Sequence, residues 1–514
     1  MDALFLPLAD AVGASVDQIK LIFCLLVAYP LGSLFVRVPA SSPNLRHLFS
    51  IGVALLFFFP VLKIYSAFFQ LLGSILATFF IAKHDRSSKM PWLVFVIVMG
   101  HLTVNHIIRA LNGSSYETME VTGPQMVLTM KLTTFAWNVY DGRRKAEDLD
   151  KWQLSKRVTE YPSLLAFLGY SFYFPGILVG PYLDFQEYTD LVNETMFQHS
   201  HVKATVKAGR RLPPGRKRAA YTKMVMGLVY LGSFVVLGPT INFTVALKPE
   251  FAKYSLIERI VRFQLGGPIE RAKYYAIWTL TEGASILTGL GFTDIVNGQP
   301  QWDGAANVKV MQIEFPSNFK VLLDAWNMKT NIWLRECVYK RVTPKGQKPG
   351  NMSSMITFFT SAFWHGIAGG YYLTFLMGGF ITASARLARQ NIRPLLLPTP
   401  TNPSGSSLKP VYDVLGTVTS IAILNYSAAP FIILSASDSI RTWNVLGWYG
   451  HIVIIGSLLF FYFGGTRYFR GLQKRNGILP ASKGKPGTTN GVSTPATEKN
   501  FVLPPSVDKV LPQQ

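Results

Sequence analysis

The chain has 514 residues, of which 49% are hydrophobic and 15% are charged, and its mean hydropathy is +0.25. The apolar residues fall in long blocks, which excludes an ordinary soluble enzyme and is typical of a protein that crosses a membrane several times. An excess of 50 Lys and Arg over 28 Asp and Glu gives a net charge of +22 at pH 7. Two cysteines, Cys24 and Cys337, are too few for a disulfide framework or a cysteine-rich metal site.

Long apolar blocks follow one another along the chain, each near the ~20 residues that a transmembrane helix needs. They cover residues 19–35, 48–62, 64–82, 92–108, 163–182, 224–247, 274–292, 352–364, 367–387, 411–435 and 446–463. We therefore expect an all-α, polytopic transmembrane fold of about 11 spans. Pro60, Pro175 and Pro239 interrupt blocks and predict broken or short helices.

The rest of the chain predicts two interfacial segments and a tail. Residues 124–145 and 317–341 mix charged with apolar residues, so we expect helices that lie along the membrane interface or dip into it. Residues 1–470 form one transmembrane domain in this interpretation, and residues 471–514, basic and then rich in Gly, Pro, Ser and Thr, form a disordered tail. The positive-inside rule places this tail in the cytosol, opposite the acidic amino terminus.

The stretch FFTSAFWHGIAGGYYLTF, residues 358–375, places a single histidine, His365, in an apolar run. An imidazole at membrane depth is costly without a partner or a task, which makes His365 a candidate site residue. Small neighbours such as Ser361 and Gly366 allow close approach of a ligand. A structural histidine is the alternative, and it is the expected role of His101 and His106, whose spacing of five suits a metal site poorly.

A second polar cluster occurs in AWNMKTNIWLRECVYKR, residues 325–341. Asn327 and Asn331 are four residues apart, so a continuous helix would place both amides on one face, beside a stripe that contains Trp326 and Trp333. Two carboxamides in lipid are expensive unless they line a ligand-filled cavity. The alternative is a polar network between helices.

Several other kinds of site find no support. The chain has no Gly-x-Ser-x-Gly elbow, no His-Glu-x-x-His zinc helix, no Walker loop and no Cys-x-x-Cys pair. No residue near Cys337 in the sequence would specifically activate its thiol as a nucleophile. We therefore expect neither a metal nor a nucleic acid as a partner.

Four segments, taken in order, resemble the lysophospholipid acyltransferase branch of the membrane-bound O-acyltransferase family. They are MVLTMKLTTFAWNVYDGR (126–143), GYSFYFPGILVGPYLDFQEY (169–188), WNMKTNIWLRECVY (326–339) and TSAFWHGIAGGYY (360–372). The resemblance covers roughly residues 30–470. It implies that the protein transfers an acyl chain from acyl-CoA, a co-substrate rather than a bound cofactor, to the free hydroxyl of a lysophospholipid in the endoplasmic reticulum membrane.

The resemblance also implies roles for individual residues. His365 corresponds to the general base, and Asn331 either orients the imidazole or hydrogen-bonds the developing oxyanion. Basic segments such as 339–348 or 201–223 would attract the CoA phosphates. The residues expected to contact substrate are Trp326, Asn327, Trp333, Ser361, Phe363, Trp364 and Tyr371.

Two alternative functions stay open on the sequence alone. Another acceptor within the same family, a sterol, a diacylglycerol or a protein, would use the same histidine. A lipid transporter or scramblase would use intramembrane His and Asn as a permeation path, although no inverted halves are visible in the sequence. Headgroup preference, acyl preference and oligomeric state are not determined by these patterns.

Overall fold

A computed structural model of the chain describes residues 2–113, 118–180, 182–198, 202, 211–343, 350–399 and 403–478. These residues are largely helical, apart from a short hairpin in which β1 (Ile295–Val296) pairs antiparallel with β2 (Gln299–Pro300). Within these ranges, seven helical stretches are long and apolar enough to cross a membrane, which confirms a polytopic helical membrane protein. They are Val16–Phe35, Pro43–Val61, Tyr65–His84, Met90–Leu111, Arg216–Leu237, Lys409–Ile433 and Tyr449–Arg475.

In chain order these stretches contain the following helices. They are α2 (Val16–Phe35), α3 (Pro43–Leu56) with the π-helix η1 (Phe57–Val61), α4 (Tyr65–His84), α5 (Met90–Leu111), α11 (Arg216–Leu237), α18 (Lys409–Ile433), and α20 (Tyr449–Phe460) with η8 (Phe461–Gly465) and α21 (Thr466–Arg475). The helix breakers act as predicted, because Pro60 lies in η1 and α11 ends two residues before Pro239.

Four expected blocks fold into helices that are shorter or more polar. Block 163–182 yields only α8 (Leu164–Ser171), after which the backbone leaves the helix ahead of Pro175. Most of block 274–292 forms the carboxyl-terminal part of α12 (Leu256–Thr288), a helix that carries several charged residues. Blocks 352–364 and 367–387 become α16 (Asn351–His365) and α17 (Gly369–Asn391).

Shorter elements connect these helices. They are α1 (Asp2–Val12), η2 (Ala146–Asp148), α7 (Lys151–Lys156), α9 (Phe185–Asn193), η3 (Thr195–Phe197), η4 (Phe243–Leu247), η5 (Pro249–Lys253), α13 (Val310–Glu314), η7 (Arg393–Leu396) and α19 (Ala436–Val445). The expected tail from residue 471 begins inside α21, and its part beyond residue 478 lies outside the described residues.

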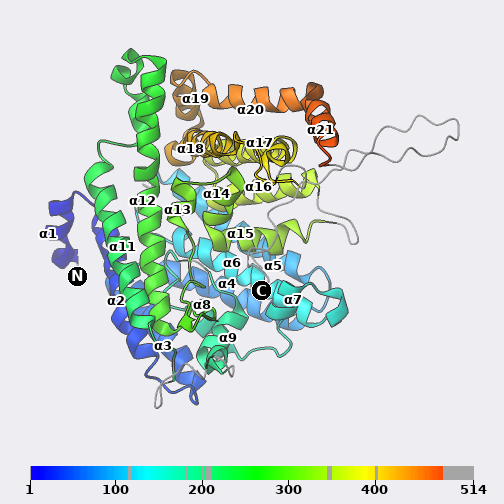
Figure 1. Ribbon diagram of the computed structural model, residues 1–514. Coiled ribbons are helices and arrows are strands. Elements are labelled where there is room, and N and C mark those ends of the chain that lie inside the picture. The colour runs from blue at the N-terminus through cyan, green and yellow to red at the C-terminus, as the bar shows by residue number, and fades with distance from the viewer. Residues whose placement is uncertain are drawn as a thin grey trace.

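Two expected interfacial segments behave differently from the prediction. Segment 124–145 forms α6 (Thr122–Gly142), which lies inside the bundle with nearly every residue buried (Figure 1). Among its polar side chains, Lys131 and Thr133 form hydrogen bonds to backbone carbonyls. Segment 317–341 forms three pieces, α14 (Phe319–Ala325), α15 (Met328–Leu334) and the π-helix η6 (Arg335–Tyr339). The break falls at Asn327, whose φ of 46° is left-handed and cannot continue a right-handed helix.

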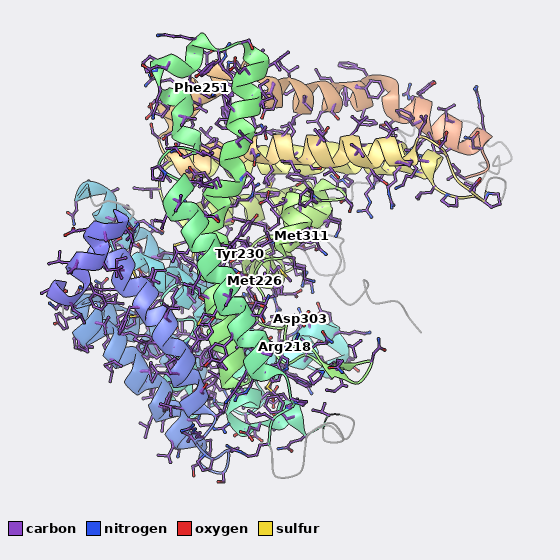
Figure 2. All side chains as sticks on the ribbon, turned by 60° about the vertical axis from the view of Figure 1, so that its left-hand side comes forward. Arg218, Met226, Tyr230, Phe251, Asp303 and Met311 are labelled. Carbon is purple, nitrogen blue, oxygen red and sulfur yellow. The ribbon has the colours of Figure 1, made fainter. Side chains whose placement is uncertain are left out.

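Helices α11 and α12 form a long packed pair, and α2 packs against α12. Figure 2 shows this pair along its length, between Arg218 near one end and Phe251 near the other. Tyr29 of α2 donates a hydrogen bond to the carbonyl of Leu280 at 2.9 Å. A Cβ on Gly283 would lie 2.1 Å from the Tyr29 hydroxyl, so only glycine allows the two helices to approach this closely.

The carboxyl-terminal helices run across the long pair (Figures 1 and 2). Helix α16 packs against α17, and α17 packs against α18. Helix α14 contacts both α17 and α18, and α15 contacts α6 and α16. These contacts bring the two predicted polar clusters to one region of the molecule.

Candidate active site

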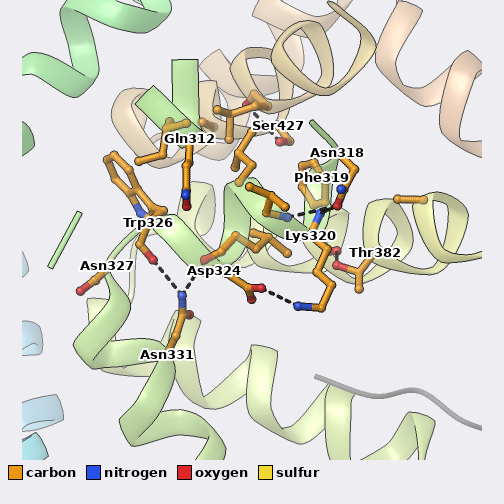
Figure 3. Close-up of a pocket in the computed structure, with 18 of the residues that line it drawn as sticks. Gln312, Asn318, Phe319, Lys320, Asp324, Trp326, Asn327, Asn331, Thr382 and Ser427 are labelled. Atoms are coloured by element: carbon orange, nitrogen blue, oxygen red, sulfur yellow. Dashed lines mark hydrogen bonds and ion pairs between the residues drawn. The ribbon is translucent and has the colours of Figure 1, made fainter. Parts of the chain in front are cut away.

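A cavity of about 1280 Å³ lies between α12, α14, α15, α16, α17 and α18. His365 and Asn331 both line it, as do Trp326, Asn327 and Ser361. Figure 3 shows the part of this cavity around Asn331 and Trp326. Its volume exceeds the ~300–1,000 Å³ that is usual for a pocket that holds one drug-sized molecule.

His365 is the last residue of α16, and aromatic rings surround its imidazole. The ring centroids lie 4.6 Å from Trp364, 5.5 Å from Tyr371, 5.4 Å from Phe375 and 4.8 Å from Phe431. Within the described residues, no group hydrogen-bonds to the imidazole nitrogens. The ring is therefore fixed by apolar packing, and its nitrogens are available to a molecule in the cavity.

Asn331 lies on α15 and caps the end of α14 (Figure 3). Its Nδ2 donates to the backbone carbonyls of Leu323 and Trp326, at 2.8 Å each. Because carbonyl oxygens only accept, these contacts identify the amide nitrogen and occupy both of its hydrogens. The Oδ1 atom of Asn331 is left as an acceptor at the cavity wall, and the side chain has no hydrogen left to donate.

Asn327 also lines the cavity, but it does not share a helix face with Asn331. The prediction of a shared face was wrong because α15 begins only at Met328, one residue after the left-handed Asn327. The Oδ1 of Asn327 accepts a hydrogen bond from Nδ2 of Asn307 at 3.0 Å. The Oδ1 of Asn307 in turn accepts from the Lys329 backbone N–H at 2.9 Å. This pair of amides fixes the start of α15.

Four of the expected substrate contacts are not among the residues that line the cavity: Trp333, Phe363, Trp364 and Tyr371. Trp333 is buried, and its Nε1 donates to the Thr133 hydroxyl at 2.9 Å. Trp364 donates from Nε1 to the carbonyl of Met126 at 3.0 Å. Both tryptophans therefore hold their helices against α6 and have a structural role.

The sequence prediction missed one wall of the cavity, which α17 provides. Its lining residues recur at helical spacing: Thr374, Phe375, Gly378, Thr382, Ala385, Arg386 and Arg389. Phe375 contacts His365, and Arg389 lies 14 residues further along the helix, about 21 Å away at 1.5 Å per residue. The only signal for this wall was the repeat of small and basic residues along one face of the helix.

The end of the cavity near Arg389 is basic. Arg386, Arg389 and Arg393 line it from α17 and η7, together with Lys320, Arg335 and Lys409. Lys320 is neutralised by Asp324 at 2.5 Å, and Lys409 pairs with Asp413. Of the loops expected to attract phosphates, residues 201, 203–210 and 344–348 lie outside the described residues.

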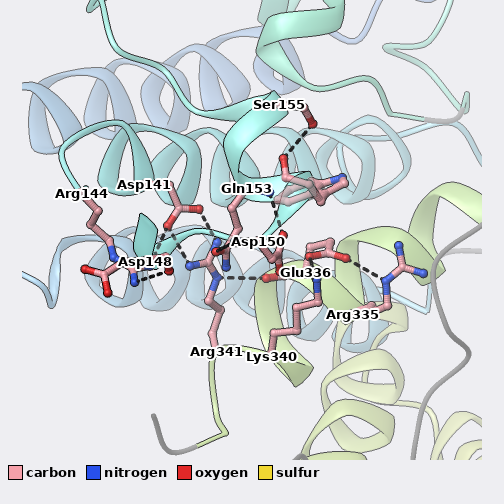
Figure 4. Close-up of polar contacts among 11 residues, drawn as sticks. Asp141, Arg144, Asp148, Asp150, Gln153, Ser155, Arg335, Glu336, Lys340 and Arg341 are labelled. Atoms are coloured by element: carbon pink, nitrogen blue, oxygen red, sulfur yellow. Dashed lines mark hydrogen bonds and ion pairs between the residues drawn. The ribbon is translucent and has the colours of Figure 1, made fainter. Parts of the chain in front are cut away.

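An ion-pair network joins η6 to α6 and α7 next to the site (Figure 4). Arg341 forms a bidentate salt bridge with the Asp141 carboxylate, at 2.9 Å and 2.5 Å. Its guanidinium lies 4.3 Å from the centre of the Trp137 ring. Lys340 contacts Asp150 at 2.7 Å. Burial alone would raise the pKa of Asp150, but the Lys340 ammonium lowers it below its ordinary value.

Loss of the Asp141 carboxylate should destabilise this network. In Asp141→Ala the buried Arg341 guanidinium keeps its charge without its partner, a change that typically costs about 3–5 kcal/mol. We expect a clearly lower thermal denaturation midpoint in detergent. The matched control is Lys145→Ala, which removes an exposed pair with Glu147 and should leave the midpoint unchanged. Equal midpoints for Asp141→Ala and the wild type would contradict the structural role.

A protein family and several individual proteins are similar to this chain in sequence. A family model described as the membrane-bound O-acyltransferase family matches residues 107–428. The lysophospholipid acyltransferase of Schizosaccharomyces pombe is 37% identical over 90% of this chain and 89% of its own length. That of Saccharomyces cerevisiae is 36% identical over 94% of this chain and 81% of its own length.

A human relative, membrane-bound glycerophospholipid O-acyltransferase 1, is 31% identical over 88% of this chain and 91% of its own length. The residues that the family model matches, 107–428, include both polar clusters that line the cavity. The family expected from the four sequence segments is confirmed, and the chain belongs to the membrane-bound O-acyltransferase family.

Proposed function

We propose that this protein is a lysophospholipid acyltransferase that uses acyl-CoA in the endoplasmic reticulum membrane. The observation that carries the proposal is the shared cavity, because His365 and Asn331, 34 positions apart in sequence, both line it. We also propose that the chain crosses the membrane about 11 times, with α12, α16 and α17 adding to the seven stretches, and that the basic tail is cytosolic.

The chemistry follows from the imidazole of His365. The hydroxyl of a lysophospholipid is a poor nucleophile at neutral pH, and a neutral imidazole can accept its proton while the oxygen attacks the thioester carbonyl. The carbon–sulfur bond then breaks, and the imidazolium returns the proton to the departing CoA thiolate. General base catalysis of this kind contributes about 10²–10⁴-fold to the rate.

The hydrogen bonds of Asn331 favour one of its two expected roles. Stabilising an oxyanion requires a donor, but both amide hydrogens already bond to the carbonyls of Leu323 and Trp326. The free Oδ1 can accept from an imidazole N–H or from the lipid hydroxyl. Asn331 is therefore an orienting residue in this proposal, and other groups stabilise the oxyanion.

The two ends of the cavity suit the two ends of acyl-CoA. The thioester must reach His365, and the phosphates suit the basic end at Arg389 and Arg393. Helix α17 links the two ends and would lie along the extended pantetheine arm. The lysophospholipid would then enter the aromatic end, where Tyr274, Trp278 and Phe431 line the wall.

Removing two cations from the basic end should weaken acyl-CoA binding selectively. For Arg389→Ala/Arg393→Ala we expect KM for acyl-CoA to rise about tenfold, equivalent to about 1.4 kcal/mol, with KM for the lysophospholipid unchanged. Initial-rate kinetics in detergent would measure both constants. Arg441→Ala is the control, because Arg441 is exposed on α19 and does not line the cavity. An equal rise in both KM values would place the phosphates elsewhere.

A panel of acceptors tests the proposed function itself. The purified protein is incubated with labelled acyl-CoA and with lysophospholipids of different headgroups, a sterol, diacylglycerol or a peptide. We expect labelled diacyl phospholipid as the product. Labelling of sterol, diacylglycerol or peptide alone would show a different acceptor, and lipid movement between leaflets without any acylation would show a transporter.

A further inference from the structure

We propose that His106 positions His365 by holding the peptide that precedes it and by confining the glycine that follows it. This inference rests on the proposed function, in which His365 is the base. His106 lies on α5, is 7% exposed and is not among the residues that line the cavity. It therefore differs from a catalytic residue, which would contact the substrate.

The first contact precedes His365 in the chain. Nε2 of His106 lies 3.3 Å from the backbone oxygen of Trp364. Because this oxygen only accepts, Nε2 carries the hydrogen and His106 donates. The Trp364 carbonyl and the His365 nitrogen belong to one peptide unit, and α16 ends here, where carbonyl groups lack partners within the helix. His106 supplies such a partner to the peptide that carries the base.

His106 also lies close to the residue that follows His365 in the chain. Gly366 has φ 132° and ψ −165°, a conformation that side-chain-bearing residues rarely adopt. A Cβ at this position would lie 3.2 Å from Nδ1 of His106. The His106 ring therefore leaves little room for a side chain at the residue where the chain leaves α16. One imidazole thus donates to the peptide immediately before the proposed base and lies close to the glycine immediately after it.

Hydrogen bonds of neighbouring residues hold α5, the helix that carries His106, next to α6. The preceding residue, Asn105, donates to Oε1 of Gln125 on α6 at 2.8 Å. The next residue on α6 is Met126, whose carbonyl accepts the indole N–H of Trp364 at 3.0 Å. Helices α5, α6 and the end of α16 therefore form a closed set of contacts. A shift of about 1 Å in such a frame is enough to lower a rate about 100-fold.

The test compares His106→Leu, which removes the donor, with His106→Gln, whose amide can still donate to the carbonyl. We expect kcat of His106→Leu to fall about 10–100-fold, with both KM values within about twofold of the wild type. We expect His106→Gln to keep kcat within about fivefold of the wild type. Rescue by glutamine is the readout that a merely structural role would not give.

His101→Leu is the matched control. His101 lies on the same helix and is also hydrogen-bonded, to Ser74 at 2.8 Å and Gln70 at 3.3 Å, but these partners lie on α4. Its kcat should stay near the wild-type value. If His106→Leu is not recovered as folded protein, His106→Asn replaces it, because the shorter amide should not reach the carbonyl and should lower kcat equally.

The proposal is overturned if the donor-less variant keeps wild-type kcat, if glutamine gives no rescue, if His101→Leu falls equally, or if the loss appears only in KM. His365→Ala in the same assay separates the two proposals. An active His365→Ala removes the proposed function itself. An inactive His365→Ala beside a fully active His106→Leu removes only the positioning role.

Discussion

Replacing His365 with alanine is expected to lower acyl transfer by about 10²–10⁴-fold. The imidazole lines the cavity and has no hydrogen-bond partner among the described residues, so the packing around it depends little on its nitrogens. Loss of the ring should therefore remove proton transfer without unfolding the bundle. The measurement is the rate of labelled phospholipid formation by purified protein at saturating acyl-CoA.

His451→Ala is the matched control for this substitution. His451 is also enclosed by rings, with centroids 4.6 Å from Trp443 and 5.0 Å from Trp448, but it does not line the cavity. We expect that variant to change stability more than activity. Substantial turnover by a folded His365→Ala enzyme would contradict the general-base mechanism.

The second large effect is expected at Asn331, where alanine should lower kcat about 100-fold. The substitution removes the Oδ1 acceptor and leaves the carbonyls of Leu323 and Trp326 without their donor. The end of α14, which forms part of the cavity wall, then loses its cap. Initial rates and the thermal denaturation midpoint should be measured on the same preparation.

Asn331→Asp distinguishes the two functions of this side chain. Aspartate keeps an oxygen that can accept, but it cannot donate to two carbonyls and places a negative charge beside them. We expect it to be as inactive as the alanine variant and less stable. Asn444→Ala is the control, because Asn444 is exposed on α19 and lies away from the cavity. Wild-type activity in Asn331→Asp would mean that the cap on α14 is unnecessary.

Much of the architecture follows from local sequence. Seven of the expected apolar blocks correspond to helical stretches able to span a membrane, because length and hydropathy decide whether a segment can span. Pro239 predicts the end of α11 for a similarly local reason. The sequence also identified His365 and Asn331 as the polar residues to explain, since such groups are costly in an apolar environment.

The prediction failed where a helix is buried or broken. Helix α6 was expected at the interface, but its Lys131, Thr133 and Asn138 are buried. For Lys131 the reason is a pair of backbone carbonyls, those of Tyr170 and Ser171, which accept its ammonium protons at the end of α8. Those carbonyls are about 40 positions away in sequence, so the periodicity of residues within α6 could not predict these hydrogen bonds.

The sequence by itself determined which segments are helical and apolar, and which few polar residues need an explanation. Only the tertiary structure decided which way each side chain points. Trp333 and Trp364 point toward α6, and the basic end of α17 lines the cavity. Both amide hydrogens of Asn331 form hydrogen bonds to carbonyls at the end of α14. The physical reason is that contacts with helices distant in sequence set the rotation of a helix about its axis. The sequence of an apolar helix alone does not indicate which of its faces makes those contacts.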